Sequence, residues 1–180
     1  TTLASRMAAA GANLTVETLD GGPIAIGDDP TRARVVFHSA DAVAAFVSAL
    51  IEEFGDEWGN KWMFHYRWAR PADQDSAGER IARSMKPDAS SAELAPLTAG
   101  VKERMVGRVW FVGSSPATAP LIEASYRDTL TILEAHLAKR PYLFGGRPAF
   151  GDFGLWGQLY NCWTDPTPGG LLKRDAPRVV

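Results

Sequence analysis

The sequence has few residues that could cross-link it or hold a metal. Its 180 residues include one cysteine, Cys162, and three histidines. A single cysteine excludes an internal disulfide framework and a zinc site built from several cysteines. His38 and His136 have no i, i+4 or H-E-x-x-H spacing to a partner, so we expect no metal site. Cys162 lies among aromatic residues near the end of a predicted helix, and we expect it to be a buried structural thiol.

Long apolar runs and an excess of one charge are also missing. No stretch approaches the roughly 20 apolar residues of a membrane span, and no signal-peptide pattern opens the chain. We therefore expect a cytoplasmic protein. The formal net charge is -2, and the basic residues are scattered among acidic ones. Such a surface has no positive field to hold a phosphate backbone, so we expect neither a nucleic-acid nor a membrane partner.

The common catalytic motifs are absent as well. There is no Walker motif and no G-x-G-x-x-G, and "GSS" at 113–115 is not the G-x-S-x-G elbow of hydrolases. The acidic stretch "ADQDS" lacks the glycine and the glutamate of a calcium loop. Catalytic sequence motifs therefore do not identify a reaction for this chain.

The chain nevertheless has the composition of a folded domain. Hydrophobic residues make up 46% and charged residues 22%, which is ordinary for a globular protein. Residues 1–37 read as a short Ala-rich helix followed by one or two strands or an extended arm, separated by Gly, Pro and Asp. From residue 38 onward the periodicity is helical almost throughout. We predict an N-terminal segment over 1–37 and a mainly α-helical domain over 38–180.

Apolar residues at three- and four-residue steps predict a long helix from Asp41 to Trp68, with Ser39 as its N-cap. Gly55 and Gly59 lie one turn apart inside it, although each disfavours a helix interior by about 1 kcal/mol relative to Ala. We expect a bend, a close contact with another helix, or a ligand near the backbone at these positions.

Further helices follow from capping signals. Ser76 is a candidate N-cap for a short helix, and Ser90 with Glu93 forms an S-x-x-E capping box for a helix over about 91–112. Thr118 is expected to be the N-cap of another apolar-periodic helix. The stretch "GGRPAFGDFGL" at 145–155 opens a helix that extends to about residue 163. "DPTPGG" is then expected to be a rigid turn before a short helix, "GLLKRDA".

The run "DEWGNKWMFHYRW" at 56–68 has the most unusual composition in the chain. Trp58, Trp62, His65 and Tyr66 fall on or near one side of the predicted helix. One interpretation is core packing, because aromatic side chains bury large areas. The other is a pocket wall for an apolar or aromatic ligand, to which His65, Tyr66 or Arg67 supplies polar contacts. His65 is also a candidate general base.

One segment carries a family resemblance. "RPYLFGGRPAFGDFGLWGQLY" at 140–160 resembles the C-terminal all-helical domain of the glutathione S-transferase superfamily. In that pattern a Ser caps the helix and an Asp three residues later bonds back to the backbone N–H of the cap. Asp152 holds the Asp position here, whereas Ala149 replaces the Ser and Gly151 replaces an Ala. We interpret Asp152 as a structural residue of the helix N-terminus.

Two other segments, "LIEEFGDEWGNKWMFHYRWARPAD" and "TDPTPGGLLKRDAPRVV", resemble a bacterial branch of the same superfamily. The resemblance implies a helical bundle that follows a thioredoxin-like domain, with glutathione as co-substrate, and it implies a homodimer. The first domain supplies the Ser, Tyr or Cys that stabilises the glutathione thiolate, and the helical domain supplies most of the pocket for the electrophile. Residues 1–37 are too short for a complete thioredoxin-like domain, so we expect a remnant or a replacement of it. The thiolate-activating residue is not identified.

The sequence thus leads to one main hypothesis and two rivals. The main hypothesis is a glutathione transferase-like enzyme that conjugates glutathione to a small hydrophobic electrophile, with Trp58, Trp62, His65 and Tyr66 lining the electrophile pocket. The first rival is a non-catalytic interaction or assembly module with the same helical fold. The second is a small-molecule carrier that uses the aromatic pocket without glutathione.

Overall fold

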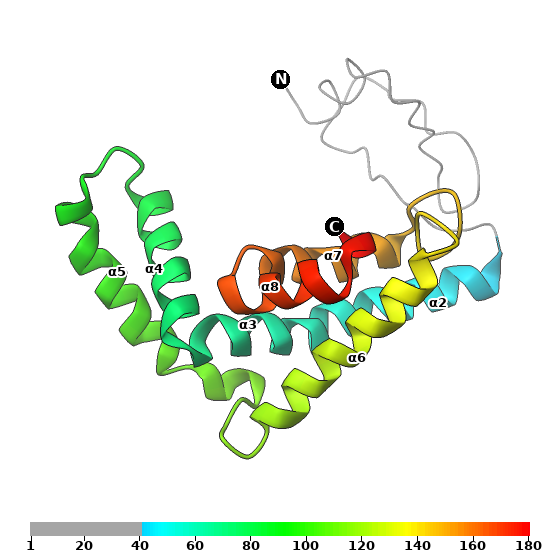
Figure 1. Cartoon of the computed structure of the whole chain (residues 1–180), viewed down its shortest axis with the longest axis horizontal. Helices are drawn as coiled ribbons and strands as arrows, with labels where there is room; N and C mark the ends of the chain where they lie inside the picture. Colours follow the sequence, from blue (N-terminus) through cyan, green and yellow to red (C-terminus); the bar gives the residue numbers. More distant parts are fainter. Residues whose placement is uncertain (1–40) are drawn as a thin grey trace.

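A computed structural model describes residues 41–180 of the protein (Figure 1). Within that range the chain is mainly helical, and its β-structure is limited to an isolated bridge between Tyr142 and Gly145. The predicted fold class, a mainly α bundle, is confirmed there. The predictions for residues 1–37 and for Ser39 fall outside the described residues. No helix of the described range combines the length and the apolar character needed to cross a bilayer.

The long helix predicted near the start of the domain is present, with a π-helical turn in its middle. Asp41 is its N-cap, because the Asp41 carboxylate accepts a hydrogen bond from the Ala44 N–H at 2.8 Å. The helix then runs without a break to Ala69. Its three parts are α2 (Ala42–Phe54), the π-helical turn η1 (Gly55–Gly59) and α3 (Asn60–Ala69).

The two glycines of this helix mark a close helix contact, which was one of the three expected reasons for them. Gly55 faces α7 (Phe150–Trp163), and a Cβ on Gly55 would lie 2.9 Å from the carbonyl carbon of Gly154. A Cβ on Gly59 would lie 3.2 Å from the side chain of Gln158. One turn before this contact, the Gly151 N–H donates to Ser48 Oγ at 2.8 Å. The backbones of α2 and α7 therefore approach closely along this side.

Helix α4 (Pro71–Met85) begins directly after α3, so the predicted N-cap at Ser76 is wrong. Pro71 is the first helical residue. The backbone N–H at that position has no acceptor within the helix, so a proline there costs no helical hydrogen bond. Arg70 before it is extended and separates the two helices. Ser76 consequently lies inside α4, and the break in periodicity around it reflects a change of helix direction a few residues earlier.

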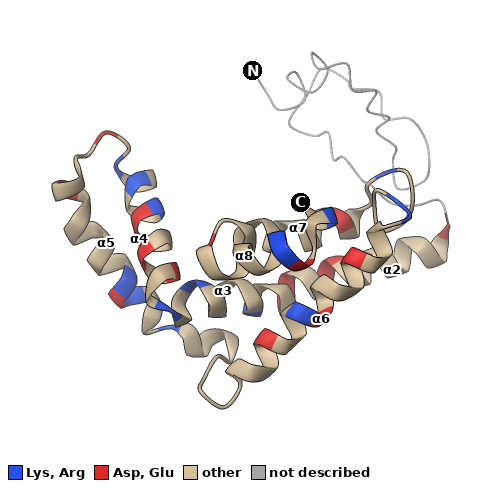
Figure 2. Ribbon diagram, in the orientation of Figure 1, with Lys and Arg blue, Asp and Glu red and all other residues tan. Residues whose placement is uncertain are grey.

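Helices α4 and α5 (Ser91–Val106) form a hairpin that projects to one side of the bundle (Figure 1, left), with α4 packed against α3 and α8 at its base. The predicted capping box at the start of α5 is confirmed. The Ser90 N–H donates to Glu93 Oε2 at 2.8 Å, and the Glu93 N–H donates to Ser90 Oγ at 3.4 Å. Both α4 and α6 carry acidic and basic residues (Figure 2).

Helix α6 (Ala119–Leu137) follows the short 3-10 turn η2 (Val109–Val112). Thr118 precedes α6 as predicted, but its hydroxyl accepts from the Ser115 N–H at 2.9 Å instead of capping the helix. After α7 comes α8 (Pro166–Asp175), then the 3-10 turn η3 (Pro177–Val179). Helix α8 starts inside "DPTPGG", so the rigid turn expected there is wrong, and its prolines occupy a first helical turn.

The main core lies between α3, α6, α7 and α8. Cys162 is fully buried there, as predicted, and burial raises the pKa of its thiol above the ordinary range. The thiol therefore stays protonated at neutral pH. The buried members of this core are Trp62, Tyr66, Ile122, Tyr126, Leu130, Leu133, Leu155, Leu159, Cys162, Leu171, Leu172 and Ala176.

Candidate functional site

Three of the four predicted pocket residues lie in the interior. Trp62 and Tyr66 are 0% exposed and His65 is 2% exposed. Trp58 is partly exposed, and its indole Nε1 donates to Ser125 Oγ of α6 at 2.6 Å, the same oxygen that Trp62 reaches at 3.1 Å. Contact of the four with a ligand stays a prediction. Among them, Trp58 alone has a side chain that a ligand can reach in this arrangement.

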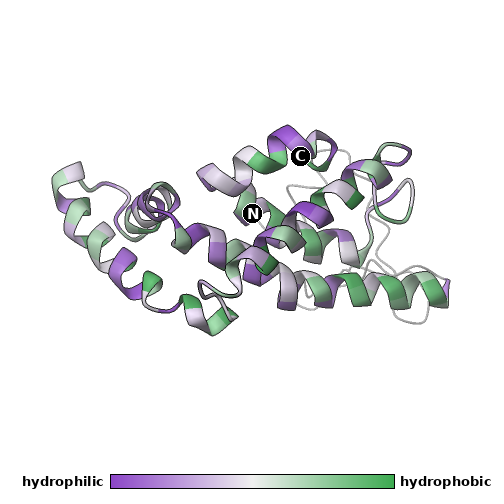
Figure 3. Ribbon diagram, turned by 60° about the horizontal axis from the view of Figure 1, so that its bottom comes forward, coloured by the Kyte–Doolittle hydropathy of each residue, from purple (hydrophilic) through white to green (hydrophobic). Residues whose placement is uncertain are grey.

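Trp58 lies at the end of an exposed apolar row. Phe46, Leu50 and Phe54 follow one another at four-residue steps on α2, and their exposed fractions are 67%, 56% and 41%. Such spacing places side chains on one helical face, and Trp58 follows four residues later in η1. The apolar character of α2 is visible in Figure 3. We call these four residues the α2 row. Contiguous exposed apolar surface commonly marks a binding site.

His65 takes part in a polar network between α3 and the region before α6. Its Nδ1 lies 2.7 Å from Ser114 Oγ, and its Nε2 lies 3.3 Å from Glu123 Oε1. Arg70 donates to the same Glu123 oxygen at 2.5 Å. Because both ring nitrogens have partners, His65 has no free nitrogen for a substrate in this arrangement. The network instead anchors the loop that contains Ser114 to α3.

The network also sets the charge of its acidic member. Partial burial raises the pKa of Glu123, but the hydrogen bonds from Arg70 and His65 outweigh that effect and hold the pKa below its ordinary value. Beside it, burial and the Glu123 charge raise the pKa of Tyr66 to about 12. At neutral pH Glu123 is therefore ionised and Tyr66 is a neutral phenol, which argues against Tyr66 as a proton acceptor.

The start of α7 is organised by Asp152. Its Oδ2 accepts from the Ala149 N–H at 2.8 Å, and its Oδ1 accepts from the Leu143 N–H at 2.9 Å. The first bond is the reciprocal half of a capping box. The second ties the segment before α7 to the helix, and His136 Nε2 donates to the carbonyl oxygen of Leu143 at 2.8 Å from the other side. Both Asp152 oxygens thus serve the fold.

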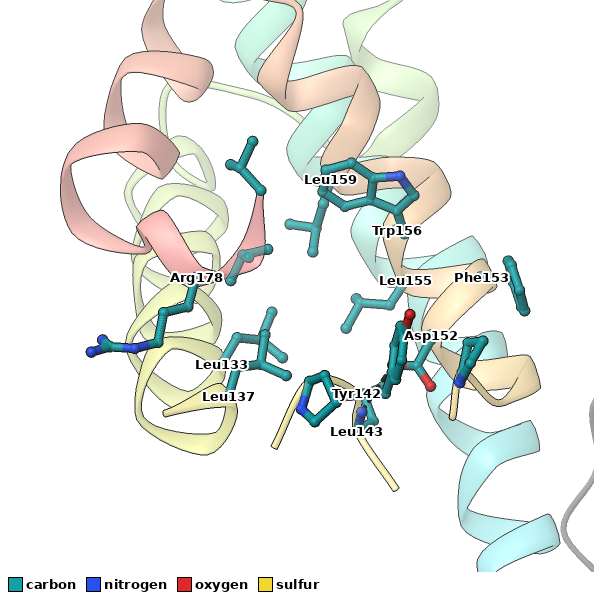
Figure 4. Close-up of a pocket in the computed structure, with 14 residues that line it drawn as sticks. Leu133, Leu137, Tyr142, Leu143, Asp152, Phe153, Leu155, Trp156, Leu159 and Arg178 are labelled. Carbon is teal, nitrogen blue, oxygen red and sulfur yellow. Dashed lines mark hydrogen bonds between the residues drawn. The ribbon is translucent and has the colours of Figure 1, made fainter. Parts of the chain in front are cut away.

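A cavity of about 290 Å³ lies between α6, α7, the segment before α7 and residues 178–180 (Figure 4). Its walls are largely aliphatic and aromatic side chains of α6 and α7. The sequence contains no signal for this cavity, because helical spacing cannot show where facing helices diverge. The residues that define its interior are Leu133, Leu137, Tyr142, Leu155, Trp156 and Leu159.

The two charged side chains that line this cavity are engaged elsewhere. Asp152 lines it, but both of its oxygens accept backbone hydrogen bonds. The guanidinium of Arg178 is directed away from the cavity and pairs with Glu134 (Figure 4). The interior is therefore suited to an uncharged ligand. Within residues 41–180, no three His, Cys, Asp or Glu side chains are grouped so that they could hold a metal ion.

Comparison with known families agrees with the resemblance found in the sequence. Residues 103–180 match the family model described as "Glutathione S-transferase, C-terminal domain". This part of the chain is therefore similar to a glutathione S-transferase C-terminal domain. The match includes α6, α7 and α8, the Asp152 contacts and all the residues that line the cavity. The α2 row lies before the matched residues. No curated protein and no solved structure matches the chain.

Proposed function

We propose that this chain is a glutathione transferase-like protein that conjugates glutathione to a small hydrophobic electrophile. The α2 row forms the wall that this domain contributes to the electrophile site. The family match supports the transferase class, and the single observation that carries the site is the exposed row from Phe46 to Trp58. Glutathione is the co-substrate, and the proposal includes a cytoplasmic homodimer.

The chemistry is attack of a thiolate on an electrophilic carbon. A carbon–sulfur bond forms, and the electron pair of the broken bond departs with the leaving group. A lowered thiol pKa supplies the nucleophile. The role of the helical domain is to bind the electrophile and to exclude water from it. No residue of 41–180 is assigned the role of activating the thiol.

The buried aromatic residue Trp62 of α3 packs beneath the α2 row. The Phe54 ring lies 5.5 Å from the Trp62 ring in an edge-on arrangement, and Trp58 shares a hydroxyl partner with Trp62. Under this proposal Phe54 and Trp58 contact the electrophile. Trp62, His65 and Tyr66 shape that surface from the interior, and they contact the ligand only if Trp58 moves aside.

The second candidate function is a non-catalytic interaction module with the same fold. The observation that favours it is also the α2 row, since an exposed apolar face suits a protein partner as well as a small molecule. Val43, 72% exposed and three residues before Phe46, lengthens that face beyond what a small electrophile would cover.

Binding to immobilised glutathione, together with conjugation of 1-chloro-2,4-dinitrobenzene, separates the two candidates. The transferase proposal expects the chain to be retained on the glutathione matrix, eluted by free glutathione, and active in the spectrophotometric assay. The interaction module expects neither retention nor turnover, and that pair of results would remove the enzymatic proposal.

A further inference from the structure

The cavity between α6 and α7 lies on a different side of α7 from the α2 row. Gly151 and Gly154 turn toward α2, whereas Leu155 and Leu159 line the cavity. Because α7 separates the two surfaces, a ligand in the cavity does not need to touch the α2 row. We propose that this cavity is a second binding site, which takes a neutral, planar molecule of one or two fused aromatic rings.

The size of the cavity supports a ligand of this kind. A cavity of about 150 Å³ lined by aliphatic and aromatic side chains is enough to bind benzene, and this one measures about 290 Å³. Pockets for drug-sized ligands begin at roughly 300 Å³. The space therefore suits a molecule larger than one ring but smaller than a typical drug, such as two fused rings.

The shape of the walls favours a flat ligand. In Figure 4, leucines of α6 and α7 face the same space from two sides, with Trp156 toward one end and Tyr142 toward the other. Aliphatic side chains on opposite faces leave a slot, and the two aromatic rings at its ends offer edge or offset contacts to a ligand ring. Leu133 and Leu155 are among the buried members of the core that forms this slot.

The charged side chains that line the cavity offer no partner to a charged ligand. Its acidic lining residue, Asp152, has both oxygens bonded to backbone N–H groups. Its basic lining residue, Arg178, is paired with Glu134 and directed outward. A sulfonate or ammonium group brought inside would lose its hydration without gaining a partner, and that loss is large for an ionised group. The ligand must therefore be neutral where it enters.

The test compares naphthalene with naphthalene-1-sulfonate, which adds one charge to the same rings. Each is followed by its own fluorescence in equilibrium dialysis against the full chain. We expect saturable binding of naphthalene, and sulfonate binding weaker by on the order of tenfold or more. No saturable naphthalene binding, or equal binding of the two compounds, would overturn the proposal.

Variants then locate the site. Leu137→Trp places a larger side chain in the cavity from α6, and Val179→Trp does so from η3 in case the first variant does not fold. Either folded variant should weaken naphthalene binding by on the order of tenfold or more. Leu121→Trp, at a 62% exposed position of α6, should leave it unchanged. Circular dichroism checks the fold of each.

A further variant separates this site from the α2 row. Phe46→Ala removes an exposed ring of that row, and naphthalene binding should be unchanged. Loss of binding in Phe46→Ala with retention in Leu137→Trp would place the ligand on the α2 row and overturn the proposal. Because the readout is binding alone, the result does not depend on whether the protein transfers glutathione.

Discussion

Gly154 of α7 lies against the backbone of Glu52 of α2, and a Cβ on Gly154 would come within 2.8 Å of the Glu52 Cα. That distance is too short for two carbon atoms, and a backbone atom cannot turn aside as a flexible side chain can. The two helices can keep this separation only if residue 154 has no side chain.

We predict that Gly154→Ala destabilises the protein by about 2 kcal/mol or more, because the helices must move apart and lose packing along their contact. Gly157→Ala is the matched control, one turn further along α7, where a Cβ would meet nothing within 4 Å. It should be neutral or stabilising by up to about 1 kcal/mol, since Ala favours a helix over Gly. Urea denaturation of both variants measures the difference; equal midpoints would contradict the close contact.

The start of α7 gives a second prediction. Asp152→Ala removes an acceptor from two backbone N–H groups and should lower the free energy of unfolding by about 2 to 4 kcal/mol. Ala149→Ser restores a capping hydroxyl at an extended N-cap position and should raise it by about 1 kcal/mol. Thermal melts of the two variants check both signs. An unchanged melting temperature for Asp152→Ala would remove the structural role assigned to that carboxylate.

The Glu123 network predicts a pH dependence. The pKa of Glu123 in the folded protein is below its ordinary value of 4.5, so the unfolded chain binds more protons between these two values. The stabilisation by Glu123 is therefore present above about pH 4.5 and lost as the pH falls through the folded pKa.

We expect the difference in unfolding free energy between the native protein and Glu123→Gln to be largest at neutral pH and to shrink in acid. Denaturation titrations at a series of pH values measure it. Glu103→Gln, at an exposed position of α5, controls for the change in net charge. If the difference in unfolding free energy between the native protein and Glu123→Gln grew on acidification, the stabilising role assigned to the ionised Glu123 would be contradicted.

The buried thiol gives a fourth prediction. Cys162 is 0% exposed and its pKa is raised by burial, so it should not react with 5,5′-dithiobis(2-nitrobenzoic acid) in the folded protein and should react fully in denaturant. Leu121→Cys in a Cys162→Ala background supplies an exposed thiol for comparison. Rapid reaction of native Cys162 at the rate of that control would show that the α6–α7–α8 core opens readily.

The sequence predicted the local features well, because they depend on neighbouring residues. The extent of the first long helix and the Ser90–Glu93 box follow from spacing alone, and the role of Asp152 at the start of α7 follows from the family resemblance. The errors at Ser76 and "DPTPGG" have a common feature: Pro71 and Pro166 are each the first residue of a helix, where a later helix start and a rigid turn were expected.

Contacts between distant residues could not be found in this way. Arg67 donates to the buried Asp165 carboxylate at 2.7 Å across 98 positions of sequence. Likewise, the aromatic run could be read as core or as pocket wall, and only the packing shows that Tyr66 is buried while Trp58 is partly exposed. The cavity between α6 and α7 had no signal beyond ordinary core spacing.

The central claim, that the α2 row binds the electrophile, is tested most directly by the KM for 1-chloro-2,4-dinitrobenzene at saturating glutathione. Phe54→Ala should raise that KM by about tenfold, which is the loss of roughly 1.4 kcal/mol of apolar contact, and the KM for glutathione should stay unchanged. Ile132→Ala, at a 66% exposed position of α6, should alter neither constant. An electrophile KM that is the same in Phe54→Ala and in the native protein would contradict the account.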